Sequence, residues 1–328
     1  MAVPVVVVGG FLGAGKTSLI NRIVNRCAPL RLSVLVNDFG ALAIDSDLIE
    51  QAGERIVTLK NGCVCCSLQG DLLASIRMVL SRPDPPDAVL VECSGVSRIG
   101  AVRDALLDPV IWQAAALEAV VCVADAADMA ADMAADGGYF DDPLRAASIR
   151  DADLVVLSKT DLLSGAVLER VLAALHARKR ADLILRPADA ADLPGLLLAA
   201  APGHARATVP RQGARFRAED GADASSLFAS VSWRSARALD FGTFQAAIQR
   251  HAATILRAKG ILRLHGREAA PLLFQMVGQR VTVGPAPARA AGADGTRLVF
   301  IGRRGRIDCA AIAADMDGCV PPGTTGEA

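Results

Sequence analysis

The sequence feature that most constrains the fold is a glycine-rich segment directly after an apolar run. Residues 3–8 are almost all valine, which favours a strand buried on both faces. The next residues, Gly10 to Thr17, read GFLGAGKT and match the pattern G-x4-G-K-[ST]. Residues 17–26 then have the pattern of a helix. A strand, this loop and a helix in that order is the context in which the pattern binds nucleotide phosphates.

Each residue type in this loop has a chemical reason. Glycines let successive backbone N–H groups converge on phosphate oxygens, and the following helix presents its positive N-terminus. The ammonium of Lys16 can reach the β- and γ-phosphates, and the hydroxyl of Thr17 can hold Mg²⁺. A dinucleotide-binding loop is disfavoured, because the glycines are not spaced as G-x-G-x-x-G. The predicted nucleotide ligands of the loop are Gly10, Gly13, Ala14, Gly15, Lys16, Thr17 and Ser18.

Further apolar runs alternate with helical patterns along the first part of the chain. They predict strands at residues 33–36, 56–59, 88–91, 119–123, 154–157 and 183–185, and helices at 17–26, 68–80, 102–108 and 168–178. The runs lack the polar alternation of a half-exposed strand, which is typical of a parallel sheet covered by helices. This region therefore predicts an α/β P-loop NTPase domain with a mostly parallel, doubly wound sheet.

The alternation ends at a segment rich in Pro, Gly and mixed charges. We expect a nucleotide-binding domain at residues 1–202, a linker at 203–226, a smaller α+β domain at 227–320 and a flexible tail at 321–328. In the smaller domain the patterns predict strands at 228–233, 261–265, 273–283 and 298–301. They predict helices at 241–259 and 309–316.

Composition excludes several classes of protein. Lys+Arg and Asp+Glu are both 35, and aromatic residues make up only 4%, which argues against a basic or stacking surface for nucleic acid. No apolar run approaches the roughly 20 residues that span a bilayer. The start of the chain has no basic segment before its apolar run and is interrupted by glycines, unlike a signal peptide. We expect a cytoplasmic protein that binds neither nucleic acid nor membrane.

A second motif bears on which nucleotide is bound. Ser158, Lys159, Thr160 and Asp161 follow the predicted strand 154–157, where P-loop GTPases carry N-K-x-D. The carboxylate of Asp161 can accept from guanine N1–H and N2–H, whereas adenine presents an acceptor there. The stem of Lys159 can lie over the base, and Ser158 replaces the usual Asn. The alternative is that Asp161 only caps a helix.

Three of the eight cysteines are clustered, as Cys63, Cys65 and Cys66. They follow a predicted strand and precede a predicted helix, whose N-terminus favours thiolates. Thiolates select Zn²⁺ or Cu⁺ and can take Co²⁺. Three thiols are one ligand short of a closed structural zinc site, which leaves a position for a labile ligand. A redox pair or ordinary buried thiols are the alternatives.

Several acids follow predicted strands at the edge where such proteins bind Mg²⁺ and the γ-phosphate. Asp38 follows strand 33–36, Asp45 lies shortly beyond it, and Glu92 follows strand 88–91. A carboxylate there can ligate Mg²⁺ or align a water molecule. The alternative for Asp38 and Asp45 is that they cap turns or helices. Asp125 ends another predicted strand and is as well explained by capping.

Taken together, GGFLGAGKTSL, NDFG, NGCVCC, ECSG and SKTDL resemble the CobW-like GTPases, relatives of the urease and hydrogenase nickel-insertion GTPases. The second unit is loosely similar to the C-terminal domain of that family. The resemblance implies a metallochaperone that binds Zn²⁺, or Co²⁺ in some members, and uses GTP to release it to a client. It implies that residues 10–18 bind phosphate, that Lys159 and Asp161 bind guanine, and that Cys63, Cys65 and Cys66 carry the metal.

The chain also departs from the family. Where the family often has Asn-Glu-Phe-Gly-Glu, this sequence has Asp38 and Ala41 at the two acidic positions, so one oxygen ligand is shortened and one is lost. Many members carry a His-rich loop between the domains, but here that loop holds only His204. A histidine-rich arm for metal storage is therefore not expected.

The leading hypothesis is a slow GTPase that couples its nucleotide state to metal delivery. GTP, Mg²⁺ and Zn²⁺, or Co²⁺ instead of zinc, are the expected cofactors, and a client metalloprotein or metal-inserting enzyme is the expected partner. Lys16, Asp38, Asp45 and Glu92 are the catalytic candidates. No catalytic Gln or arginine finger is evident, so efficient turnover would need a partner or a nucleotide-dependent dimer. A P-loop ATPase or kinase with structural zinc, and a nucleotide-gated protein-binding regulator, remain the alternatives.

Overall fold

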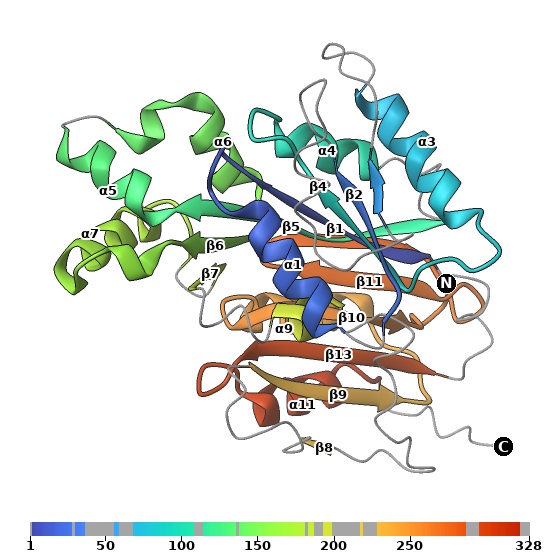
Figure 1. The fold of residues 1–328 in the computed structure, drawn as a ribbon. Coiled ribbons are helices and arrows are strands. Elements are labelled where there is room, and N and C mark those ends of the chain that lie inside the picture. Colours follow the sequence, from blue (N-terminus) through green and yellow to red (C-terminus); the bar gives the residue numbers. More distant parts are fainter. Residues whose placement is uncertain are drawn as a thin grey trace, which may run out of the picture. The chain divides into compact units, whose positions relative to one another are not determined.

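The computed structural model describes residues 2–27, 30–36, 56–58, 68–107, 114–135, 138–180, 183–186, 193–198, 217–218, 228–286 and 295–321. The chain divides into two compact units, Ala2–Ala207 and Thr208–Ala328. Figure 1 shows the elements of both units, which are described separately below. Among the described residues, none of the helices is both long and apolar enough to span a membrane.

The N-terminal unit is built on a seven-stranded sheet in the order β3-β2-β4-β1-β5-β6-β7. All of its neighbouring strands pair in parallel. The strands are β1 (Val3–Gly10), β2 (Leu32–Val36), β3 (Ile56–Thr58), β4 (Ala88–Glu92), β5 (Ala115–Asp125), β6 (Leu154–Ser158) and β7 (Ile184–Leu185). β1 lies between β4 and β5, and later strands add on both sides of it, so the predicted doubly wound parallel sheet is confirmed.

The strands are apolar because both faces of the sheet are covered. Val5, Val6, Val7 and Val8 have no exposed surface, and all five residues of β2 are buried. The helices are α1 (Lys16–Arg26), α3 (Leu68–Leu80), α4 (Ile99–Leu106), α5 (Ala126–Ala134), α6 (Pro143–Asp151), α7 (Gly165–His176) and α8 (Leu193–Leu198), with short 3-10 turns η2 (Tyr139–Asp141) and η3 (Thr160–Leu162).

Three helices of this unit, α5, α6 and α8, were not predicted. α5 consists only of Ala, Asp and Met, so its apolar face is made of alanines and two methionines. α6 lacks the apolar stripe of an amphipathic helix. The sequence indicates the start of α5 and of α6 through their capping residues instead. Asp125 accepts from two amides at the start of α5, and Asp142 does the same for α6, which has Pro143 in its first turn.

The C-terminal unit contains a six-stranded antiparallel sheet in the order β12-β11-β10-β13-β9-β8. Its strands are β8 (Arg217–Ala218), β9 (Phe228–Ser235), β10 (Ile255–Leu262), β11 (Leu272–Val277), β12 (Arg280–Pro285) and β13 (Thr296–Arg303). α9 (Phe241–His251) and α11 (Cys309–Gly318) pack on one face, where their apolar residues share a core with Trp233, Phe274 and Phe300. The predicted smaller α+β domain is confirmed.

Three element predictions in this unit are wrong. The strand expected at 261–265 is only the end of β10, which stops at Leu262. The helix expected at 241–259 ends at His251, and residues 255–262 form β10. The apolar residues of this stretch suit either period, and pairing with β11 and β13 decides in favour of a strand. The strand expected at 273–283 is the hairpin of β11 and β12, which turns at Gly278 with a φ of 58°. Within the predicted linker, Arg217–Ala218 pair with β9.

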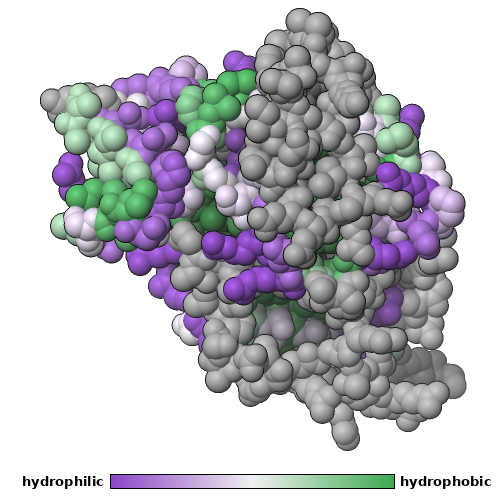
Figure 2. All heavy atoms as spheres, viewed as in Figure 1, coloured by the Kyte–Doolittle hydropathy of each residue, from purple (hydrophilic) through white to green (hydrophobic). Residues whose placement is uncertain are grey.

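The surface of the N-terminal unit contains both hydrophilic and hydrophobic residues. Figure 2 shows hydrophilic and hydrophobic residues side by side over the region of α5 and α7. Leu12 and Leu162 are exposed apolar side chains, with exposed fractions of 59% and 66%. Single exposed apolar residues of this kind are normal on a folded protein.

Candidate nucleotide site

The loop between β1 and α1 has a conformation that requires glycine at three positions. Gly10, Gly13 and Gly15 have φ values of 138°, 74° and 93°, a region that residues with a Cβ rarely adopt. At Gly10 a Cβ would also lie 2.2 Å from the carbonyl oxygen of Val123 on β5. The glycines of the sequence motif are thus the positions at which the backbone turns.

The start of α1 is suited to an anion. Gly15 occupies the N-cap position, where it provides no side-chain hydrogen bond to the first turn of the helix. The amides of that turn therefore receive no side-chain cap, and they carry the positive end of the helix dipole. This is the arrangement in which a phosphate group can supply the missing acceptors.

The functional side chains of the loop already have partners. Lys16, 8% exposed, donates from Nζ to the carbonyl oxygen of Phe11 at 3.2 Å. Thr17 donates from Oγ1 to Oε1 of Glu92 at 2.8 Å. Glu92 ends β4, beside β1 in the sheet, and is 2% exposed. A buried carboxylate and a hydroxyl in contact form the oxygen donor set that Mg²⁺ prefers, so these residues fit that ion.

Ser158 links the second motif to the phosphate loop. It ends β6, and its hydroxyl lies 2.7 Å from the carbonyl oxygen of Ala14 and 3.2 Å from that of Ala124. Because a hydroxyl has one proton, it donates to one of these acceptors at a time. Ser158, in the position where Asn is usual, therefore still hydrogen-bonds to the phosphate loop.

Lys159 is held in an uncommon backbone conformation beside a buried acid. Its φ of 53° is the one positive value among the described residues other than glycine. Nζ of Lys159 lies 2.5 Å from Oδ2 of Asp125, and this hydrogen bond raises the pKa of Lys159. Asp125 also caps α5, so it both caps a helix and fixes the lysine. Sequence reasoning missed this contact, although the position of Asp125 at a strand end pointed to a role.

Asp161 is exposed and lies within η3, two residues after Lys159. The alternative in which Asp161 caps the next helix is wrong, because α7 begins at Gly165 and Ser164 occupies its N-cap position. Because its side chain is exposed, Asp161 is accessible to a ligand. Ser158, Lys159 and Asp161 thus come together at the carboxyl end of β6, which pairs with β5.

The predicted metal ligands Cys63, Cys65 and Cys66, and the predicted acids Asp38 and Asp45, lie outside the described residues. Within the part of the chain that the structure describes, there is no group of three or more His, Cys, Asp or Glu that could hold a metal ion. Two cysteines of the N-terminal unit, at positions 93 and 122, are buried, and burial raises the pKa of each thiol to about 12. Those two thiols are therefore ordinary core residues.

The fold and the loop define the class of the protein. A doubly wound parallel sheet with a G-x4-G-K-T loop between its central strand and the next helix is that of a P-loop nucleotide-binding protein. Residues 4–185 match the family described as CobW/HypB/UreG, nucleotide-binding domain, and residues 228–320 match the cobalamin synthesis protein cobW C-terminal domain. The chain belongs to the CobW/HypB/UreG family, which confirms the resemblance seen in its motifs.

Individual relatives carry names that refer to zinc. The protein named zinc chaperone CobW of Sinorhizobium sp is 27% identical over 342 residues, covering 95% of this chain and 96% of the relative. The protein of the same name from Pseudomonas aeruginosa is 32% identical over 216 residues, covering 58% of each. The crystal structure of Zn(II)-bound YjiA GTPase from E. coli aligns with 98% of this chain and 100% of its own, at 20% identity and a TM-score of 0.41.

Proposed function

We propose that this protein is a GTPase that binds Zn²⁺ and couples its nucleotide state to delivery of the metal to a client metalloprotein or metal-inserting enzyme. The observation that carries the nucleotide half is the contact between Thr17 and Glu92, 2.8 Å apart at the base of the phosphate loop. The metal half is supported by the sequence of the cysteine triplet and by relatives named zinc chaperones.

In this proposal the phosphate loop binds the nucleotide phosphates through its backbone amides and through Lys16, Thr17 and Ser18. Lys16 leaves the carbonyl oxygen of Phe11, 3.2 Å away, and moves its charge to the β- and γ-phosphates. Thr17 and Glu92 hold Mg²⁺, which when bound offsets negative charge on the transferring phosphoryl group. Asp38 and Asp45 are the remaining candidates for orienting the attacking water.

The base is guanine in this proposal. Asp161 accepts from two guanine donors, and the stem of Lys159 lies against the ring while Asp125 fixes its ammonium at 2.5 Å. Adenine would leave the carboxylate facing an acceptor, at a cost of about 1–3 kcal/mol or more. GTP should therefore displace a fluorescent guanine nucleotide far better than ATP does. The Asp161→Ala variant should lose that preference. Preferential binding of ATP would instead favour a kinase or ATPase.

The metal is carried by Cys63, Cys65 and Cys66, with Zn²⁺ favoured and Co²⁺ as the alternative ion. The test is the affinity for each ion with a non-hydrolysable GTP analogue and, separately, with GDP. A difference of about tenfold or more is expected, because coupling free energies are typically about 1–3 kcal/mol. Equal affinities in the two states would remove the proposed coupling and favour a structural metal.

The thiols can be tested apart from the nucleotide site. The double variant Cys65→Ser/Cys66→Ser should lose metal affinity and keep GTP binding. Cys309→Ser, which changes a half-buried thiol at the start of α11, is the matched control and should keep both. If the double variant lost GTP binding to the same degree, the triplet would be structural and the metal assignment would fail. GTP binding without turnover, even with the client present, would favour a regulator.

A further inference from the structure

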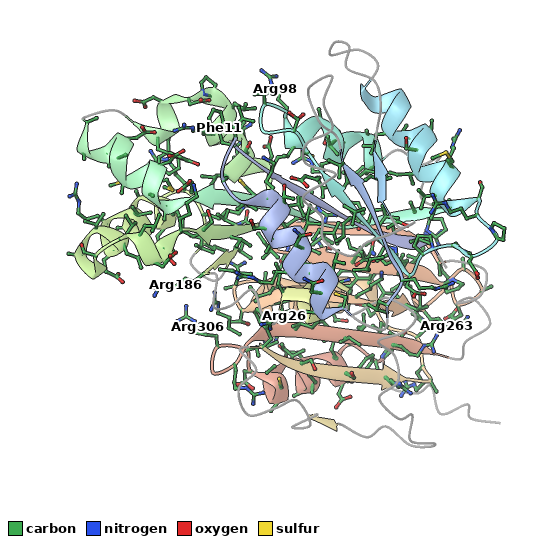
Figure 3. The ribbon with its side chains drawn as sticks, viewed as in Figure 1. Phe11, Arg26, Arg98, Arg186, Arg263 and Arg306 are labelled. Carbon is green, nitrogen blue, oxygen red and sulfur yellow. The ribbon has the colours of Figure 1, made fainter. Side chains whose placement is uncertain are left out.

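A cation on α6 contacts the phosphate loop from outside the motif. We propose that Arg145 is a positioning residue, which fixes Phe11 and through it the conformation of the loop that receives the nucleotide. The inference rests on the proposed nucleotide function, since it concerns the same loop. Figure 3 labels Phe11 at the point where the loop after β1 approaches α6, and no sequence motif includes Arg145.

Arg145 contacts two aromatic rings. The guanidinium carbon of Arg145 lies 4.3 Å from the centre of the Phe11 ring and 4.7 Å from the centre of the Tyr139 ring. Both distances are within the range of a cation–π interaction, which is stronger when the cation is shielded from water. The Arg145 side chain is only 16% exposed. Arg145 therefore bridges a loop aromatic and an aromatic of the N-terminal unit that is itself 4% exposed.

Acids hold the guanidinium in place. Nη1 of Arg145 lies 2.5 Å from Oδ2 of Asp132, and Asp128 and Asp142 each place a carboxylate oxygen 3.9 Å from another nitrogen of the group. Asp142 is also the N-cap of α6 and accepts from the backbone amide of Arg145 at 3.2 Å. With α5 and the start of α6 both supplying acids, the guanidinium has one favoured orientation, and that orientation faces Phe11.

Phe11 is the loop residue on which this restraint has most effect. Its carbonyl oxygen accepts from Lys16 Nζ at 3.2 Å, so the ring that Arg145 stacks on and the acceptor that holds Lys16 belong to one residue. Fixing Phe11 therefore fixes the starting position of the lysine that must move to the phosphates.

α5, which supplies two of these acids, also contacts the base-binding loop. Its N-cap residue Asp125 pairs with Lys159 at 2.5 Å, and Asp132 further along the helix pairs with Arg145. The phosphate loop therefore has contacts on two sides, at Ala14 with the Ser158 hydroxyl of the base-binding loop and at Phe11 with Arg145. A loop ordered before the ligand arrives has less conformational entropy to lose on binding, which increases affinity.

The test measures affinity for a fluorescent GTP analogue in the full-length protein. Arg145→Ala and Phe11→Leu should each weaken binding by about fivefold, the effect expected for loss of one shielded cation–π contact. The double variant should bind about as weakly as either single variant, because both changes remove the same contact. Arg178→Ala is the matched control, since Arg178 stacks on Phe140 at 3.7 Å outside the phosphate loop; its affinity should equal that of the wild type.

The outcomes separate the two proposals. If the wild-type protein binds no GTP, the proposed function fails. If it binds GTP and Arg145→Ala binds equally well, or if the two single effects multiply in the double variant, the positioning role is refuted and the proposed function is not affected. Urea unfolding of each variant provides the second readout. A purely structural role would lower the unfolding midpoint of Arg145→Ala and leave the affinity of the folded protein unchanged.

Discussion

Ser158→Ala tests whether the base motif contributes to the geometry of the phosphate loop. The substitution removes a hydroxyl 2.7 Å from the carbonyl oxygen of Ala14, a residue with no exposed surface. A hydrogen bond of this kind contributes about 0.5–1.5 kcal/mol net, and more where water cannot replace the lost donor. Without it the loop must be ordered when the nucleotide binds. We expect a loss of about 1 kcal/mol, which is roughly fivefold in GTP affinity.

The assay is a calorimetric titration of each variant with GTP and, separately, with GDP. Urea unfolding of the same samples measures the stability of the fold. Ser164→Ala is the matched control, because Ser164 is an exposed serine shortly after the same motif and its side chain makes no capping hydrogen bond to α7. Both variants remove one hydroxyl from neighbouring positions. Only Ser158→Ala should weaken binding, and it should weaken GTP and GDP alike, since the bond does not involve the γ-phosphate.

Two results would refute this reasoning. Unchanged affinity in Ser158→Ala would mean that the hydrogen bond to Ala14 adds nothing to the geometry of the loop. Equal weakening in Ser164→Ala would mean that the effect comes from the general packing of the segment. A lower unfolding midpoint with unchanged nucleotide affinity would place the contribution of Ser158 in the stability of the fold alone.

Two further predictions come from a close contact and from a titrating acid. A Cβ on Gly95 would lie 2.7 Å from the backbone nitrogen of Leu12, so Gly95→Ala should displace the phosphate loop and weaken GTP binding. Gly165→Ala is the control, because a Cβ there would lie in open space, and it should not weaken binding. GTP binding by Gly95→Ala equal to that of the wild type would contradict this reasoning. The hydrogen bond from Arg250 lowers the pKa of Asp315 from its ordinary 3.8. The ionised Asp315 therefore stabilises the fold fully at pH values above its ordinary pKa of 3.8, and this contribution is lost as the pH falls through the lowered pKa. Urea midpoints of wild type and Asp315→Asn should differ at neutral pH and converge in acid; equal midpoints at pH 7 would refute this.

Local patterns predicted the strands of the N-terminal unit well, whereas they missed the helices α5, α6 and α8. The strands from β1 to β7 are short, apolar and bounded by turn residues, and each was expected within a few residues of its observed position. The helix expected at 241–259 was wrong in its second half, because the apolar residues at 255–262 have no period that separates a strand from a buried helix. Gly260 shows what decided it, since a Cβ there would lie 1.9 Å from the carbonyl oxygen of Arg297 on the paired strand.

The sequence by itself determined β1, the phosphate loop and α1. The apolar run, the glycines and the Lys-Thr pair that mark these elements are adjacent in the chain and have a fixed spacing. The residue types of the second motif predict a guanine nucleotide, which stays a prediction. Only the tertiary structure decided which distant side chains meet. Thr17 and Glu92 are 75 residues apart, and Ser158 and Ala14 are 144 apart. These contacts depend on the order in which the strands pair, and that order is set by long-range packing that no local pattern encodes.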